Sequence, residues 1–318
     1  MPATSLRLGV VMDPIESITP KKDSTLAMLL EAARRDAEIH YFGQADIRLL
    51  AGEAYGNSTL LEVRDNLDDW FTLGRSQDIR LGDLDVILMR KDPPFDMEYI
   101  YSTYILERAG DAGAMIVNHP QSLRDMNEKA YIAWFANCAP ATLITRSQSK
   151  FKAFLREHKH IVCKPLDGMG GKSIFLVRND DQNANVIFET LTDNGRRYAM
   201  SQVYIPEITQ GDKRILLIDG EPVPFALARV PSGDDFRGNL VMGAVGRGQE
   251  LSERDRWICD QVGPALRDRG VVFAGIDVIG DYLTEINVTS PTGIRELDAA
   301  FDLNIAAALF DAIEARLG

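Results

Sequence analysis

The residues best suited to chemistry lie between positions 160 and 178, where two short apolar runs flank a glycine-rich loop. The runs 161–163 and 174–177 have the composition of β-strands, so the loop is predicted to be a hairpin tip. Glycine lets backbone N–H groups approach an anion closely, because no Cβ intervenes. Lysines near both ends of the loop indicate a polyphosphate as the anion. The loop residues concerned are Lys164, Gly168, Gly170, Gly171, Lys172 and Ser173.

The order Gly171, Lys172, Ser173 suggests a P-loop, but two observations exclude that motif. A P-loop needs a glycine five places before Gly171, and this chain has Leu166 there. A P-loop also leads into a helix, whereas the β-branched and aromatic run SIFLV follows here. An ordinary tight hairpin with an unimportant lysine remains the alternative on this motif alone.

A second group of polar residues lies on two apolar runs, 271–279 and 283–288, which are typical of another hairpin. Glu285 and Asn287 are two residues apart and share one face of their strand. A three-residue loop would set Asp277 opposite Glu285, whereas a two-residue loop would put them on opposite faces. Three converging oxygen ligands suit a hard cation such as Mg²⁺. The alternative is a polar sheet face, but the nearby phosphate loop favours a metal–nucleotide site.

The formal net charge of −12 argues against a nucleic-acid partner, which usually leaves a basic stripe. The glycine loop nevertheless needs cations, so basic residues are expected to converge locally. Pro93 and Pro94 end an apolar run and hold Arg90 and Lys91 in a loop at the carboxyl end of a strand, where open α/β sheets bind ligands. Two solvated charges in a turn are the alternative on these residues alone. The candidates for this convergence are Arg90, Lys91, Lys129, Lys164, Lys172, Arg214, Arg229, Arg237 and Arg247.

Alternating strands and helices must position these residues. Ser24 is predicted to cap a first helix, and Lys129 to lie in the first turn of a helix spanning 126–137. Ser252 is expected to cap a helix that Gly270 ends. Strands are predicted at 6–13, 38–42, 59–63, 84–89, 114–118, 199–205, 214–220 and 221–230, and further helices at 99–112, 149–158, 185–193 and from 293 onward.

The stretch 230–248 holds five glycines and has no clear periodicity, which predicts a long loop. Core elements flank it, and it carries Arg237 and Arg247. We therefore expect a lid, and a disordered insertion is the alternative.

Composition places the chain among ordinary globular proteins. With 318 residues, 45% hydrophobic and 26% charged, it is long enough for two or three subdomains. Its three cysteines are odd in number and widely spaced, so disulfide and zinc frameworks are not expected. No secretory signal and no apolar stretch of membrane-spanning length is found, which predicts a cytoplasmic protein without a membrane partner.

Six strings together resemble the bacterial glutathione synthetases, a family with the ATP-grasp fold. They are VMDPI at Val11, DVILMRKDPPFD at Asp85, NHPQSLRDMNEK at Asn118, KPLDGMGG at Lys164, GDKR at Gly211 and LTEINVTSPTGIRE at Leu283. The resemblance spans nearly the whole chain. It implies an α/β fold with an amino-terminal Rossmann-like domain (1–122), a central ATP-grasp subdomain (123–204) and a carboxyl-terminal one (205–318) that carries the lid.

The same resemblance implies roles for individual residues. It places Lys129 and Lys164 at the ATP phosphates, Gln202, Val203, Tyr204 and Ile205 along the adenine, and Asp212 at the ribose. Gly168, Met169, Gly170 and Gly171 would cover the phosphates. Arg214 and Arg229 would face the transferring phosphoryl group. Asp277, Glu285 and Asn287 would hold two Mg²⁺, for which Mn²⁺ can substitute. The dipeptide would contact Arg90, Ser290, Pro291, Thr292 and Gly293.

The activity implied is ATP-dependent ligation of γ-glutamylcysteine to glycine through an acyl phosphate, by a homotetramer. Two other readings stay open on the residues alone. Another ATP-grasp ligase, such as a D-alanine:D-alanine ligase, would share the nucleotide half. A nucleotide-binding regulatory module without turnover is disfavoured, because a degenerate site need not keep Lys129, Lys164, Asp277, Glu285 and Asn287 together.

Overall fold

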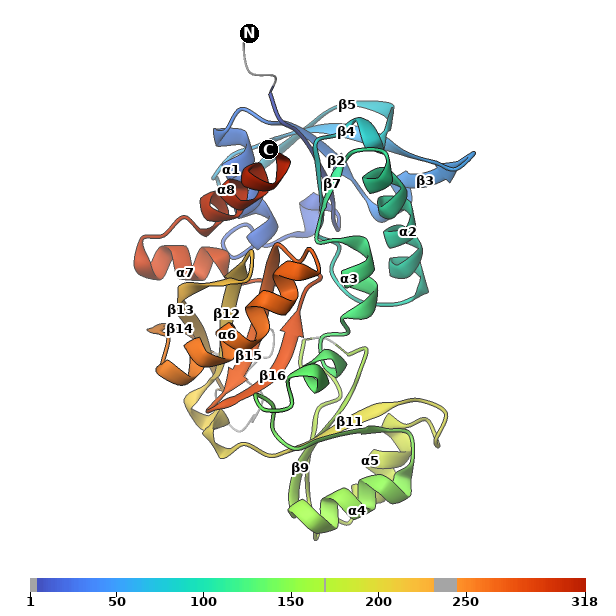
Figure 1. The fold of residues 1–318 in the computed structure, drawn as a ribbon, viewed down its shortest axis with the longest axis vertical. Coiled ribbons are helices and arrows are strands. Elements are labelled where there is room, and N and C mark those ends of the chain that lie inside the picture. The colour runs from blue at the N-terminus through green and yellow to red at the C-terminus, as the bar shows by residue number, and fades with distance from the viewer. Residues whose placement is uncertain (1–4, 169, 232–244) are drawn as a thin grey trace.

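Three β-sheets organise the chain in the computed structural model, which describes residues 5–168, 170–231 and 245–318. In Figure 1 the amino-terminal sheet lies at one end of the elongated molecule, and a small sheet with helices α4 (Gln148–His158) and α5 (Ala184–Leu191) lies at the other. The third sheet, with helix α6 (Glu253–Asp268), lies between them. None of the helices described is long and apolar enough to cross a membrane.

The first sheet has a parallel core, as the near-continuous apolar runs predict. Its order is β3-β4-β2-β1-β6-β7, and β5 pairs with β4. The pairs β1–β2, β1–β6 and β6–β7 are parallel. The strands are β1 Arg7–Val11, β2 Glu38–Phe42, β3 Ile47–Leu50, β4 Glu53–Val63, β5 Phe71–Arg80, β6 Val86–Met89 and β7 Met115–Val117, with helices α1 Ser24–Arg34 and α2 Met97–Asp111.

The start of α1 differs by one residue from the sequence prediction. Asp23, not Ser24, is the N-cap, and its side chain accepts a hydrogen bond of 2.6 Å from the Leu26 N–H. The Ser24 hydroxyl instead accepts hydrogen bonds from the N–H groups of Gly293 and Ile294, at 3.1 and 3.2 Å. Ser24 therefore supports the start of a distant helix instead of its own.

The second sheet is antiparallel, in the order β10-β9-β11-β8. The predicted glycine hairpin is confirmed, because β9 and β10 pair antiparallel with Cys163 opposite Phe175. A separate small core lies under this sheet, where Phe151 and Phe188 stack with ring centroids 5.3 Å apart. The elements are β8 Thr142–Thr145, α4 Gln148–His158, β9 His160–Pro165, β10 Phe175–Arg178, α5 Ala184–Leu191 and β11 Ala199–Val203.

The third sheet has the order β14-β13-β12-β15-β16 and is antiparallel throughout. Val230 and residues 245–248 belong to paired strands, so the predicted loop 230–248 is wrong at both its ends. The expected Ser252 cap of α6 is confirmed as a capping box with Asp255. The elements are β12 Asp212–Ile218, β13 Glu221–Val230, β14 Val245–Glu250, α6 Glu253–Asp268, β15 Phe273–Ile279 and β16 Tyr282–Asn287.

The predicted helix 126–137 is wrong, because residues 126–129 are not helical and only a short 3-10 helix lies within this range. Helix α3 Pro120–Asp125 ends before Asn127, and a 3-10 helix, Ala130–Phe135, follows with Lys129 as its N-cap. The Asn127 carboxamide oxygen accepts hydrogen bonds from the N–H groups of Lys129 and Ala130, at 3.2 and 2.9 Å. A side chain that satisfies backbone donors in this way begins a new helix and interrupts the old one.

The last two helices, α7 Ile294–Phe301 and α8 Ile305–Leu317, both pack against α1, and α7 also contacts β13 and β14 of the third sheet. Helix α8 lies beside α1 (Figure 1), and Arg35 pairs with Asp311 and Glu314 of α8 at 2.6 and 2.8 Å. One buried apolar cluster, which includes Leu8, Leu29, Leu216 and Leu309, also joins the amino-terminal and carboxyl-terminal parts. The shorter 3-10 helices are Ile15–Ser17, Gln44–Asp46, Leu81–Asp83 and Pro206–Gln210.

Candidate active site

A cavity of about 330 Å³ lies between the second and third sheets, and most of the predicted site residues line it. The glycine loop and β11 supply one wall, and β12, β15 and β16 supply the other. Predicted residues in this lining are Lys129, Lys164, Gly168, Gly170, Gly171, Gln202, Val203, Tyr204, Ile205, Asp212, Arg214, Arg229, Asp277, Glu285, Asn287, Ser290, Pro291 and Thr292. Lys172 also lines the cavity.

The hairpin β15–β16 brings Asp277 and Glu285 together through a β-bulge. Ile279 pairs with Tyr282, so the connecting loop has two residues, which alone would place the two carboxylates on opposite faces. A register shift after Asp277 leaves Thr284 as an extra residue and sets Asp277 opposite Glu285. The predicted convergence is therefore confirmed, although the loop has two residues and not three.

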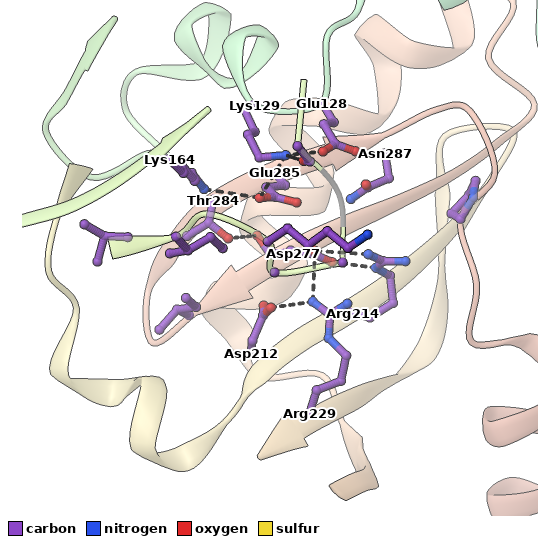
Figure 2. Close-up of a pocket in the computed structure, with 18 of the residues that line it drawn as sticks. Glu128, Lys129, Lys164, Asp212, Arg214, Arg229, Asp277, Thr284, Glu285 and Asn287 are labelled. Carbon is purple, nitrogen blue, oxygen red and sulfur yellow. Dashed lines mark hydrogen bonds and ion pairs between the residues drawn. The ribbon is translucent and has the colours of Figure 1, made fainter. Parts of the chain in front are cut away.

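Glu285 lies between two buried lysines (Figure 2). Its Oε1 atom is 3.2 Å from Lys164 Nζ and 3.7 Å from Lys129 Nζ. Burial alone would raise the pKa of Glu285, but the charges of Lys129 and Lys164 outweigh it and hold the pKa below its usual value. Glu285 is therefore ionised and held as a carboxylate between two ammonium groups.

Lys129 also contacts a residue that sequence reasoning left out. Its ammonium group pairs with the Glu128 carboxylate and donates a hydrogen bond of 2.6 Å to the Gly168 carbonyl. Burial lowers the pKa of Lys129, yet the charges of Glu285 and Glu128 raise it above its ordinary value. Glu128 directly precedes Lys129 in the string NHPQSLRDMNEK, but only Lys129 matched a phosphate-binding position of the family.

A second charge cluster surrounds Asp277 (Figure 2). Arg214 binds this carboxylate through two nitrogens, with 3.0 Å between Nη2 and Oδ2, and Arg229 Nη2 lies 2.9 Å from the same Oδ2. Burial would raise the pKa of Asp277, but Arg214 and Arg229 hold it far below its usual range. Arg229 also pairs with Asp212, whose pKa burial raises to about 7 despite that pairing.

The donor set of the predicted metal site is two carboxylates and one amide. No group of three or more His, Cys, Asp and Glu side chains suited to a metal occurs in the described ranges. Asn287, however, projects from the same face as Glu285, and its Nδ2 atom is buried without a hydrogen-bond partner. These oxygen donors fit Mg²⁺, provided that the metal displaces the lysine and arginine contacts of Glu285 and Asp277.

Apolar side chains also line the cavity, and such a lining would suit a flat base such as adenine. Residues 202–205, which the resemblance places along the adenine, belong to the lining, and the Gln202 amide donates a hydrogen bond to the Thr142 hydroxyl at 3.2 Å. Sequence reasoning missed the apolar lining, because such residues in strands look like any core residue. They are Val162, Ile174, Ile208, Leu227 and Ile279.

Some predicted residues do not belong to the described lining. Arg90 is buried and donates to the Pro291 carbonyl at 2.9 Å and to the Thr25 hydroxyl at 3.1 Å, so it supports the 290–292 segment from behind. Gly293 is absent from the described lining. Arg247 is exposed on β14. Met169 and Arg237 lie outside the described residues.

Two antiparallel sheets that face each other across a cavity lined by lysines, arginines and an acidic hairpin define the ATP-grasp class of ligases. Two family models match the chain: the prokaryotic glutathione synthetase N-terminal domain over residues 6–124, and the ATP-grasp domain of the same family over 128–302. The chain belongs to the prokaryotic glutathione synthetase family.

Curated relatives and solved structures agree with this assignment. The chain is 57% identical to the glutathione synthetase of Salmonella typhimurium LT2 and 56% identical to that of Escherichia coli K12, over 98% of this chain and 99% of each relative. The fold resembles D-cycloserine synthetase DcsG, with a TM-score of 0.69, 15% identity and coverage of 98% and 100%. It also resembles the ATP-grasp ligase PsnB complexed with minimal precursor, Mg and ADP, with a TM-score of 0.63, 16% identity and 99% coverage of both chains.

Proposed function

We propose that the cavity binds ATP with Mg²⁺ and joins γ-glutamylcysteine to glycine, releasing glutathione, ADP and phosphate. Membership of the family makes the chain an ATP-dependent ligase that synthesises glutathione. The observation that carries the proposal is the convergence of Lys129, Lys164, Arg214 and Arg229 around the acidic hairpin of one cavity. A chain with net charge −12 concentrates cations there for an anionic substrate.

The chemistry follows from the poor reactivity of a carboxylate toward an amine at neutral pH. An oxygen of the cysteinyl carboxylate attacks the γ-phosphorus of ATP, and ADP leaves. The glycine amine then attacks the acyl carbon, loses a proton and expels phosphate. The charge that spreads over the transferring phosphoryl oxygens is stabilised by fixed cations, which are already in place before the reaction.

Each proposed role rests on the position of a side chain. Lys129 and Lys164 hold the phosphates beneath the glycine loop, and residues 202–205 align the adenine. Asp212 accepts a hydrogen bond from the ribose, in keeping with its Oδ1 atom, which is buried without a partner among the described residues. Arg214 and Arg229 face the γ-phosphoryl group.

Asp277, Glu285 and Asn287 are proposed to hold two Mg²⁺, for which Mn²⁺ can substitute. Bound there, the metal supplies positive charge to the phosphate oxygens. The Ser290–Thr292 backbone, supported by Arg90, and the adjacent Gly293 are proposed to hold the dipeptide. The proposed division into units 1–122, 123–204 and 205–318, the homotetramer, the cytoplasmic location and the lid role of Arg237 and Arg247 remain predictions.

Product analysis tests the substrate assignment. The purified chain is incubated with ATP, Mg²⁺ and either γ-glutamylcysteine plus glycine or D-alanine alone, and products are separated by mass spectrometry. We expect glutathione from the first mixture and no dipeptide from the second. D-alanyl-D-alanine as the main product would replace the proposal with the alternative ligase activity.

A further inference from the structure

Glu128 lines the cavity and yet has no part in the reaction as described above. Its side chain is 20% exposed and pairs with Lys129, whose side chain is 4% exposed. Figure 2 shows Glu128 beside Lys129, on the same side of the cavity as Glu285 and Asn287. A carboxylate placed this close to a phosphate site repels phosphate, so its presence needs a reason.

The backbone fixes Glu128 in this place. Its carbonyl accepts a hydrogen bond of 2.8 Å from the N–H of Ile286, which lies between Glu285 and Asn287 on β16. Lys129 reaches the opposite wall, because its ammonium group donates to the Gly168 carbonyl of the glycine loop at 2.6 Å. Glu128 and Lys129 therefore join the acidic strand to the glycine loop.

The charges on this side of the cavity cancel. Two ammonium groups, of Lys129 and Lys164, face two carboxylates, of Glu128 and Glu285. A metal at Glu285 would offset that carboxylate. Glu128 would then be the carboxylate nearest Lys129 that no metal offsets. Its charge would attract a bound metal ion and repel the phosphates of a nucleotide in the same cavity.

We propose that Glu128, through its negative charge beside Lys129, makes nucleotide binding depend on the metal. The inference rests on the proposed binding of ATP and Mg²⁺ in this cavity. Because the Glu128 charge opposes the nucleotide and favours the metal, it strengthens the coupling between the two ligands. Such coupling is reciprocal, because the metal changes the affinity for the nucleotide by the same factor as the nucleotide changes the affinity for the metal. It can therefore be measured with either ligand.

The test is Glu128→Gln, which keeps the side-chain shape and removes the charge. ADP binding is measured by calorimetry, first with EDTA and then at saturating Mg²⁺. We expect metal-free ADP to bind roughly tenfold more tightly to the variant, since the repulsion between the Glu128 carboxylate and the phosphates of ADP is lost. With Mg²⁺ the affinities of variant and parent should agree within about threefold, because lost repulsion of ADP and lost attraction of Mg²⁺ offset each other.

A purely structural role predicts the opposite sign. If Glu128 only kept Lys129 in place, Glu128→Gln would weaken ADP binding with and without Mg²⁺. Unchanged or weaker metal-free binding therefore overturns the proposal. If Glu128→Gln fails to fold, Glu128→Asp replaces it, because the shorter side chain retracts the carboxylate from Lys129. This variant should tighten metal-free ADP binding by a smaller factor.

Two control variants test whether the effect depends on the position of Glu128 or follows from any loss of negative charge near the glycine loop. Asp167→Asn removes a carboxylate from the residue before Gly168, but Asp167 is 52% exposed and pairs with Arg197 at 2.5 Å, so metal-free binding should stay unchanged. In a Lys129→Met background, Glu128→Gln should still tighten metal-free ADP binding, because the carboxylate repels the nucleotide directly. If the parent chain binds no ADP under either condition, the proposed nucleotide site itself is wrong; if the parent binds and only the Glu128 response is absent, only this inference fails.

Discussion

Glu285 is the residue at which the charges of the cavity meet, because it contacts both Lys164 and Lys129 and lies opposite Asp277. We predict that Glu285→Gln lowers kcat by ~10²-fold or more, since it removes charge from a proposed shared metal ligand. Initial rates at saturating Mg²⁺ measure this. Glu250→Gln, an exposed carboxylate on β14, is the control and should keep the parent rate. A kcat within a few-fold of the parent for Glu285→Gln would contradict the proposed metal site.

The two lysines of the glycine hairpin differ in burial, and their substitutions should differ accordingly. Lys164 is 5% exposed and lies 3.2 Å from Glu285, whereas Lys172 is exposed at the tip. Lys164→Ala should raise the KM for ATP and lower kcat, and Lys172→Ala should do both to a smaller extent. Steady-state kinetics of the two variants measures the ranking. Equal losses, or a larger loss at Lys172, would mean that the phosphates lie nearer the tip.

At the scale of the elements, helix α6 touches the β12–β13 turn backbone to backbone. A Cβ on Gly263 would lie 2.0 Å from the Gly220 carbonyl oxygen, so Gly263→Ala must push the helix away. We predict a loss of about 2 kcal/mol or more in the free energy of unfolding. Urea denaturation measures it.

Gly110 of α2 provides the matched control. A Cβ there meets only Ile116 Cγ1, at an ordinary 3.5 Å. Gly110→Ala should therefore keep or raise stability by about 0.5–1 kcal/mol, because alanine favours the helix. If Gly263→Ala and Gly110→Ala lowered the free energy of unfolding equally, the close contact of Gly263 would not explain the loss.

The elements also show what sequence patterns can and cannot predict. The glycine hairpin, the parallel core and the α6 cap were predictable, because apolar runs, glycines and a capping serine act locally. Strand β5 was missed, since it is mostly exposed and lacks apolar alternation. The bulge at Thr284 was missed because it depends on how β16 pairs with β15. The break at Asn127 was missed because it depends on the hydrogen bonds of the Asn127 side chain, one of which reaches the Leu166 carbonyl.

The same limit applies to the site. Charged residues that gather in one cavity could be found from family strings, but the role of Glu128 and the apolar lining of the cavity could not. Their roles depend on which neighbours they meet, and only the folded chain supplies those neighbours. Arg90 was placed at the substrate from its loop position, whereas its burial makes it a support for Pro291.

At the scale of the whole molecule, Asn118 joins the first sheet to the third. Its Nδ2 donates to the carbonyls of Phe273 and Val288, at 2.7 and 2.6 Å, and its Oδ1 accepts from the N–H groups of Val272 and Phe273, at 2.8 and 3.0 Å. Asn118→Leu leaves these buried groups unpaired. We predict a loss of about 3 kcal/mol or more in the free energy of unfolding.

Denaturant unfolding measures this loss, with Asn185→Leu on the exposed face of α5 as the control that should change stability by less than about 0.5 kcal/mol. An equally small effect of Asn118→Leu would show that the two sheets are held together by apolar packing alone.

The central claim is that one cavity couples ATP cleavage to peptide-bond formation. It is tested most directly by measuring ADP release while each substrate is omitted in turn. We predict one ADP per glutathione when ATP, Mg²⁺, γ-glutamylcysteine and glycine are all present, and ADP release near background when the dipeptide or glycine is left out. Steady ADP release that does not depend on the dipeptide, or glutathione formation without matching ADP, would contradict the account.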